Sequence, residues 1–96
     1  MPIYPRITRV IAKPPFTVTL WFADGSTGTV DLQPLIGGRG GVFSPLQDEN
    51  YFARVTVDPE AGTIVWPNGV DLDPDILYAA AHGIQDMAAN FGPRRR

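Results

Sequence analysis

The chain has 96 residues, of which 44% are hydrophobic and 19% are charged, a balance that excludes a disordered protein and allows one hydrophobic core. It contains no cysteine, so disulfides, thiolate metal sites and cysteine nucleophiles are excluded. Its net charge is −2, and three of its eight basic residues form the C-terminal run Arg94–Arg96. We therefore expect one domain over residues 1–93 and a basic tail over 94–96, with an acidic body that opposes binding along phosphates.

The N-terminal stretch carries Pro2, Pro5, Arg6 and Arg9 and no long apolar run. It therefore has the features of neither a signal peptide nor a membrane span. We expect a cytoplasmic protein that makes no use of a membrane.

A hairpin is predicted in the first third of the chain. A short strand around Ile7–Ile11 ends at Pro14 and is expected at a sheet edge. Apolar and polar residues alternate over Phe16–Phe22, which is typical of a half-buried strand. Asp24-Gly25 then predicts a tight turn of type I′, in which both residues have positive φ, and residues 27–32 return as the partner strand.

Trp21 lies on the opposite face of this strand from the buried alternating positions. Two interpretations stay open from the sequence. Trp21 is either exposed, where an aromatic side chain can anchor a partner, or covered by a second layer such as the last helix.

The middle of the chain predicts a loop and a helix. The loop is the glycine-rich segment Gly37–Gly41. Ser44 is expected to cap the helix, with Pro45 in its first turn and Gln47 completing a capping box. The apolar positions of this helix would be Leu46, Tyr51 and Phe52.

A second hairpin and a longer helix complete the chain. Strands are expected at 55–58 and 63–66, on either side of a turn. Asp73 is a suitable cap for the helix and Pro74 its first residue, while Gly83 allows a break in it. One apolar stripe follows helical spacing: Leu77, Ala81, Ile84, Ala88 and Phe91. The fold class is thus α+β: a small antiparallel sheet built from two hairpins, a short middle helix and a longer C-terminal helix.

The polar residues of the last third do not form a recognisable catalytic or metal motif. Asp71, Asp73 and Asp75 alternate like calcium ligands, but the loop lacks the glycine and the final glutamate that such a site requires. His82 is the only histidine. We expect no metal, no cofactor and no catalytic residues, and we take Asp73 and Asp75 as helix-cap residues.

Several segments resemble a family of small bacterial proteins, the domain-of-unknown-function family 2442, over about residues 3–78. The segments are Trp66–Pro74 with Leu77 and Tyr78, Phe22–Gly25, Leu35, and Gly41–Leu46. The resemblance implies an α+β fold of antiparallel strands and short helices, and it supplies no activity or catalytic residue. Members of the family are often neighbours of another small protein, which suggests a toxin–antitoxin-like pair, and some carry a helix-turn-helix. The 18 residues after Tyr78 are too few for such a domain, which argues against DNA binding.

We therefore predict a non-enzymatic interaction domain, an adaptor or an antitoxin-like partner of another protein. Its predicted contact residues are Trp21, Trp66, Asn68, Asp71, Tyr78, Ala80 and Met87. Two alternatives remain: nucleic-acid binding through the Arg tail and exposed aromatics, and a small ligand-binding or enzymatic domain that uses Asp71, Asp73 and His82.

The last helix is the predicted interface. A second apolar line, formed by Ile76, Ala80, Gly83 and Met87, leaves only a narrow polar strip on it. Such a helix is usually covered, either by the domain's own loops or by a second polypeptide. We predict a second polypeptide, which is another copy of this chain or an unrelated protein.

Overall fold

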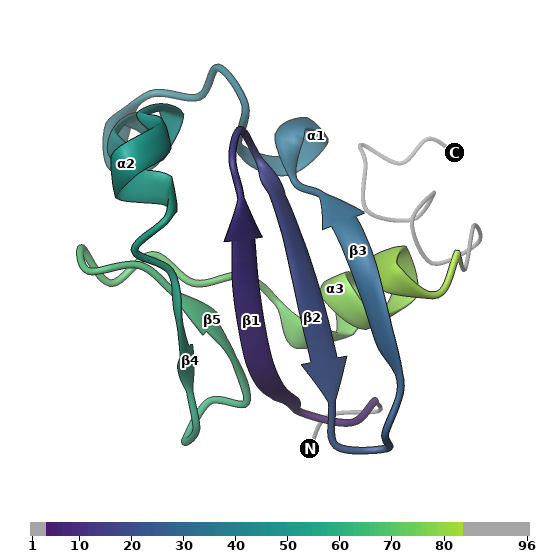
Figure 1. Ribbon diagram of the computed structural model, residues 1–96. Helices are drawn as coiled ribbons and strands as arrows, with labels where there is room; N and C mark the ends of the chain where they lie inside the picture. The colour runs from purple at the N-terminus through teal and green to yellow at the C-terminus, as the bar shows by residue number, and fades with distance from the viewer. Residues whose placement is uncertain (1–3, 84–96) are drawn as a thin grey trace, which may run out of the picture.

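The computed structural model describes residues 4–83, in which the chain forms two small antiparallel sheets and short helical segments (Figure 1). The elements follow in the order β1 (Ile7–Lys13), β2 (Thr17–Phe22), β3 (Thr27–Asp31), α1 (Gln33–Ile36), the 3-10 helix η1 (Gly41–Gln47), α2 (Glu49–Phe52), β4 (Thr56–Asp58), β5 (Thr63–Val65) and α3 (Pro74–Ala81). The fold class is α+β, as predicted. None of the described helices is long and apolar enough to cross a membrane.

The first three strands form one sheet in which β2 lies between β1 and β3. Leu20 and Phe22 are buried and Thr19 and Trp21 are half-buried, as the alternating pattern predicted. Gly25 has a φ of 88°, which confirms the predicted left-handed residue. The turn is not type I′, however, because Asp24 does not share the positive φ. A backbone hydrogen bond from Phe22 to Ser26 closes a three-residue loop instead, and the Asp24 carboxylate accepts from the Ser26 N–H.

The strand β2 begins one residue later than predicted. Phe16 has a φ of 64° and belongs to the turn that follows β1, so it cannot continue the extended ladder. Its ring still packs edge-on against Phe52. The apolar residue therefore contributes to the core from a turn position.

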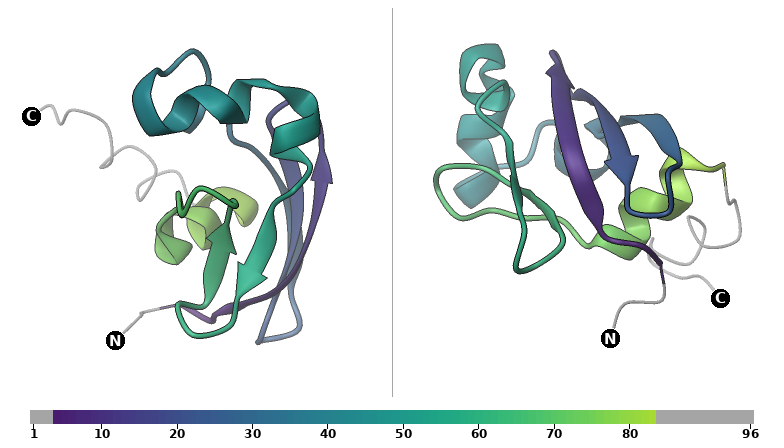
Figure 2. Two further views of the ribbon diagram at one scale, coloured as in Figure 1. Left: turned by 90° about the vertical axis from the view of Figure 1, so that its left-hand side faces the viewer. Right: turned by 60° about the horizontal axis from the view of Figure 1, so that its bottom comes forward.

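The predicted second hairpin is confirmed as the two-stranded sheet of β4 and β5. It packs beside β1, where the Ile7 N–H donates to the Gly62 carbonyl over 3.0 Å. Figure 2 shows the larger sheet nearly edge-on, with α3 and this hairpin on one side and the α1–η1–α2 segment across one end. The other side of the sheet carries no described element.

The core lies between the inner face of the larger sheet and these covering elements. Its buried hydrophobic residues are Ile7, Val18, Leu20, Phe22, Val30, Leu32, Ile36, Leu46, Phe52, Val55, Ile64, Trp66, Val70, Leu77 and Ala79. The helix α3 lies close to β3, since a Cβ placed on Gly28 would be 2.7 Å from that of Ala81. Gly28 therefore permits the helix to approach the sheet.

The middle helix differs from the prediction. Ser44 and Leu46 belong to η1, and α2 begins only after Asp48, whose carboxylate accepts hydrogen bonds from the backbone N–H groups of Asn50 and Tyr51. Gln47 does not form a capping box. Its amide group donates to the carbonyls of Ile36 and Phe43 and accepts from the Gly38 N–H, so it connects the end of α1 to η1.

The start of the last helix is as predicted, with the Asp73 carboxylate accepting from the Asp75 N–H and Pro74 in the first turn. The helix ends at Ala81, and Gly83 has a φ of 68°, so the helix breaks where the sequence allowed it. Leu77 is buried, while Ile84, Met87, Ala88 and Phe91 lie outside the described residues.

Candidate functional site

The outer face of the larger sheet is an open surface built from alternate residues of β1, β2 and β3. It consists of three cross-strand rows: Arg9–Trp21–Thr27, Ile11–Thr19–Thr29 and Lys13–Thr17–Asp31. We call these nine residues the open sheet face. In Figure 1 this face is turned toward the viewer, and no described element lies over it. The face is open because α3 and the second hairpin both pack on the opposite side.

Trp21 is half-buried on this face, and its ring is partly covered by a neighbouring side chain. The guanidinium carbon of Arg9 lies 4.6 Å from the centre of the Trp21 ring, a cation–π contact. The next row contains Ile11, which is 38% exposed. Within residues 4–83 no second layer covers Trp21, and its side chain is half-buried rather than fully exposed.

Trp66 is not a surface residue, which corrects its prediction as a contact residue. Only 2% of it is exposed, and its indole N–H donates to the Phe52 carbonyl over 3.0 Å. Its ring packs against that of Phe52. The Trp-Pro-Asn-Gly segment therefore contributes its tryptophan to the core, where burial and one hydrogen bond satisfy both parts of the indole.

Asn68 and Asp71 line a shallow hollow of about 300 Å³ on another part of the surface, together with Val42, Phe43, Gly69 and Val70. The Asn68 amide donates to the Val42 carbonyl over 2.9 Å, and its oxygen accepts from the Val70 N–H. Asn68 thus connects η1 to the loop before α3. Val42 is 61% exposed beside it. Asn68 has a structural role here, and Asp71 remains an exposed wall residue.

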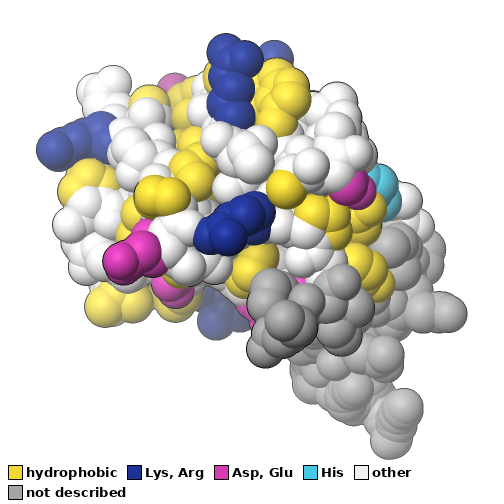
Figure 3. Space-filling view, turned by 90° about the horizontal axis from the view of Figure 1, so that it is seen from below, with side chains coloured by type: hydrophobic (Ala, Val, Ile, Leu, Met, Phe, Trp, Pro, Cys, Tyr) yellow, Lys and Arg dark blue, Asp and Glu magenta, His cyan; other side chains and the backbone are white. Residues whose placement is uncertain are grey.

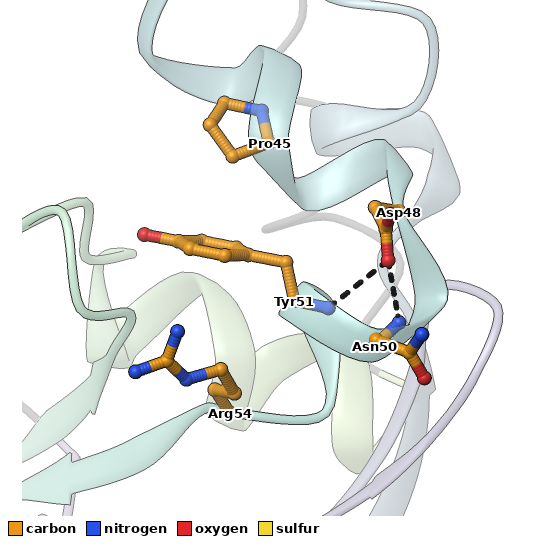
Figure 4. Close-up of a pocket in the computed structure, with 5 residues that line it drawn as sticks. All are labelled: Pro45, Asp48, Asn50, Tyr51 and Arg54. Carbon is orange, nitrogen blue, oxygen red and sulfur yellow. Dashed lines mark hydrogen bonds between the residues drawn. The ribbon is translucent and has the colours of Figure 1, made fainter.

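A second hollow of about 380 Å³ lies on the other flank of η1 (Figure 4). Pro45, Asp48, Asn50, Tyr51 and Arg54 line it. The guanidinium carbon of Arg54 lies 5.7 Å from the centre of the Tyr51 ring. One carboxylate oxygen of Asp48 is already used by the cap of α2. The hollow is an open recess with one basic and one acidic side chain.

Tyr78 lies at a third place, between α3 and the β2–β3 hairpin. Its ring stacks on Tyr4 at 4.6 Å and on His82 at 3.9 Å, and its hydroxyl donates to the Asp24 carboxylate. The hydrogen bonds from Ser26 and from Tyr78 lower the pKa of Asp24, while the bond to Asp24 raises the pKa of Tyr78. Figure 3, in which the molecule is seen from below, shows an acidic side chain next to the histidine.

These pKa shifts stabilise an ionised Asp24 and a protonated Tyr78, the reverse of what a tyrosine nucleophile needs. The His82 ring nitrogen Nδ1 lies 2.9 Å from the Tyr78 carbonyl, at the end of α3. The cluster therefore holds the helix against the hairpin.

The acidic side chains at the start of α3 already have hydrogen-bond partners. Asp73 caps the helix, and an oxygen of Asp75 accepts from the Tyr4 N–H. Within residues 4–83 no group of three histidine or acidic residues is placed to hold a metal ion.

The structure thus separates the predicted contact residues. Trp21 lies on the open sheet face, Asn68 and Asp71 at the first hollow, Tyr78 in the aromatic cluster and Ala80 on the exposed side of α3. Met87 lies outside the described residues. Sequence reasoning missed Arg9 and Ile11 as neighbours of Trp21. The alternation within β1 places Arg9 and Ile11 on one face of that strand. Which β2 residues they lie beside depends on a register shift between Ile7 and Arg9 that no local pattern shows.

Comparisons with known proteins agree with the resemblance seen in the sequence. Neither the curated proteins nor the solved structures give a match. A family model described as a protein of unknown function (DUF2442) matches residues 7–83, which include the open sheet face, both hollows and Tyr78. The chain therefore belongs to the DUF2442 family of proteins of unknown function.

Proposed function

We propose that this domain is a non-enzymatic binding module that holds a protein partner on the open sheet face. The observation that carries the proposal is the group formed by Arg9, Trp21 and exposed Ile11 on a face that no described element covers. Tryptophan and arginine are the residues most often found at the energetic centre of protein interfaces. A flat sheet face also presents them on a rigid support.

The charge of the face indicates the chemistry of the partner. Arg9 and Lys13 are basic, and Asp31 is its one acidic residue, with an oxygen that accepts from the Gln33 N–H. The whole chain is nevertheless acidic, with a net charge of −2. A partner that offers apolar side chains to Trp21 and Ile11 and acidic side chains to the two basic residues suits this surface.

An adaptor or an antitoxin-like component would use such a surface, and this is the role that we propose, in the cytoplasm. Such a protein needs a rigid, partner-specific face and no catalytic group. Structural roles are taken by the hydrogen-bonded Asp24–Tyr78 pair, by Asp73, which caps α3, and by Asp75, whose carboxylate accepts from the Tyr4 N–H.

The test compares two substitutions on the open sheet face with a matched substitution elsewhere on the surface. Tagged wild-type chain is used to capture its partner from the source cells, and the purified pair is then measured by calorimetry. We expect Ile11→Asp and Trp21→Ala to weaken the affinity at least tenfold, because they remove the apolar centre of the interface. Val42→Asp, at the 61% exposed residue on another part of the surface, should leave the affinity unchanged. Equal binding by wild type and Ile11→Asp would exclude the open sheet face.

Single-stranded nucleic acid is the second candidate, because Arg9 and Lys13 accompany Trp21 on the same face. Basic residues beside an aromatic platform are typical of sequence-tolerant strand binding. The acidic body and the Arg9 group already stacked on Trp21 favour a protein instead. Binding of an oligonucleotide with a steep dependence on salt would support the nucleic-acid role.

A further inference from the structure

The free edge of the larger sheet is formed by β3, and its unpaired backbone groups can be identified from the ladder. Phe22 donates to the carbonyl of Ser26 at one end, and Leu32 donates to that of Phe16 at the other. In the antiparallel pair of β2 and β3, opposed residues alternate between pairs that exchange backbone hydrogen bonds and pairs that do not. The two end bonds show that Leu20 with Gly28 and Val18 with Val30 are the hydrogen-bonded pairs. The β3 residues that alternate with Gly28 and Val30 therefore direct their backbone N–H and C=O groups away from β2.

These residues are Thr27, Thr29 and Asp31, which we call the β3 edge. The hydroxyl oxygens of Thr19 and Thr29 lie 3.0 Å apart, as expected for an opposed pair without backbone hydrogen bonds between its members. Within residues 4–83 the backbone groups of the β3 edge have no partner outside the ladder. The β3 edge thus offers the backbone N–H and C=O groups of three residues for pairing with another strand.

The two edges of the sheet differ in how they are protected. At β1 the Ile7 N–H is bonded to Gly62 of the second hairpin, the register shifts between Ile7 and Arg9, and Lys13 ends the strand. Pairing, bulges and lysines are the usual means by which proteins block an edge. The β3 edge has a regular register and contains neither lysine nor proline.

We propose that the β3 edge pairs with the same edge of a second copy of this chain, so that two sheets become one of six strands. An antiparallel two-fold pairing centred on Thr29 places Thr27 opposite Asp31 of the second copy on the outer side. No like charges face each other, and a threonine hydroxyl can donate to each carboxylate. On the inner side Gly28 faces Val30, a small residue opposite a large one. The interface is therefore self-complementary, as a two-fold dimer requires.

The inner layer permits the same pairing. The end of α3 lies beneath β3, with Ala81 against Gly28 and Ala80 exposed. Small side chains at this position let a neighbouring helix come close. The chain's own residues 84–96 are less suited to the edge, because they include Ile84 and Phe91 but no run of strand-forming residues, and Asp, Ala, Asn, Gly and Pro, which strands disfavour, lie between and after these two. A second copy brings a ready strand instead.

The pairing would also extend the open sheet face, since its middle row would continue through Thr29 into the second copy. Dimerisation is nevertheless independent of whether the face binds a partner. It is measured on the purified chain alone, so its failure and the failure of the proposed function can be told apart.

The first experiment measures mass in solution over a range of concentrations. We expect wild type to change from 10.5 kDa toward twice that mass as concentration rises. Thr29→Lys should stay monomeric, because two lysines would then face each other across the two-fold axis. Thr19→Lys, on the same face of the central strand, is the matched control and should still dimerise. A wild type of constant monomer mass, or equal association of the two variants, overturns the proposal.

The second experiment uses the absence of cysteine. In the proposed dimer the two Cα atoms of residue 29 are about 5.5 Å apart, within reach of a disulfide. The two Cα atoms of residue 19 are roughly 15 Å apart, because two more strand spacings separate them. Under mild oxidation Thr29→Cys should form a covalent dimer and Thr19→Cys should not. Equal cross-linking of the two variants, or none at position 29, contradicts the pairing.

Discussion

The Tyr78 hydroxyl on α3 donates a 2.8 Å hydrogen bond to the Asp24 carboxylate at the tip of the β2–β3 hairpin, 54 residues earlier in the chain. Ser26 donates to the other oxygen of the same carboxylate through both its backbone N–H and its hydroxyl. A single ionised side chain thus connects the turn to the helix that covers the inner face of the sheet.

This connection predicts a dependence of stability on pH. The pKa of Asp24 is lowered below 3.8 by its bonds from Ser26 and Tyr78, so its contribution is complete above about pH 4 and is lost as the pH falls through the folded-state value. The bond to Asp24 raises the pKa of Tyr78 above 10.0, so that contribution is present at lower pH and is lost as the pH rises through the raised value. Urea denaturation from pH 2 to 11 should show both losses. Asp24→Asn should flatten both limbs, and two unchanged limbs would contradict this role.

Trp66→Phe should destabilise the fold by about 2 kcal/mol or more. The substitution leaves a gap in the core and deprives the Phe52 carbonyl of its indole donor. Trp21→Phe, on the open sheet face, is the matched control and should change the free energy of unfolding much less. Chemical denaturation measures both, and a larger effect at Trp21 would contradict the placement of Trp66 in the core and of Trp21 on the open sheet face.

Gly25→Val should cost at least about 1 kcal/mol, because a β-branched residue resists a φ of 88°. A Cβ at Gly25 would meet no atom within 4 Å, so the cost is conformational and not steric. Gly40 also has open space for a Cβ but has a φ of −94°, which makes Gly40→Val a suitable control. Thermal denaturation should separate the two variants, and equal midpoints would remove the special role of Gly25.

Gly28→Ala tests the close approach of α3 to β3. The added Cβ would lie 2.7 Å from both the Cβ and the carbonyl oxygen of Ala81, so the helix must shift, at an expected cost of about 1–3 kcal/mol. Ala81→Gly in the same chain should restore only part of this loss, since the carbonyl oxygen remains. Complete restoration by the double substitution would show that the side chain alone sets the distance.

Asp48→Ala should destabilise the protein by about 1 kcal/mol, because two N–H groups at the start of α2 lose their acceptor. Ser44→Ala is the matched control and should have little effect, since no described residue in η1 receives a side-chain cap from it. A larger loss of stability for Ser44→Ala than for Asp48→Ala would indicate that the helix begins at Ser44, as the sequence predicted.

Local sequence patterns determined those parts of the structure whose causes lie within a few residues. The alternation over β2 predicts a strand with one buried face, because successive side chains point to opposite sides. Gly25 and the pair Asp73-Pro74 likewise act within their own turn, through a left-handed φ and a capped helix start. Membership of the family could also be recognised from short segments such as Trp66–Pro74.

Tertiary packing decided the features that depend on distant segments. Ser44 and Asp48 both satisfy the capping rule, but Asp48 caps α2, while Gln47 bonds to the Ile36 and Phe43 carbonyls and the Gly38 N–H instead of completing a capping box. Trp66 follows β5 in the segment that packs on the inner side of the larger sheet, whereas Trp21 lies on the outer face of β2, which no described element covers. Trp66 is consequently buried and Trp21 stays on the surface beside Arg9. Burial depends on which elements meet in space, and one strand's alternation defines two faces without specifying which one will be covered.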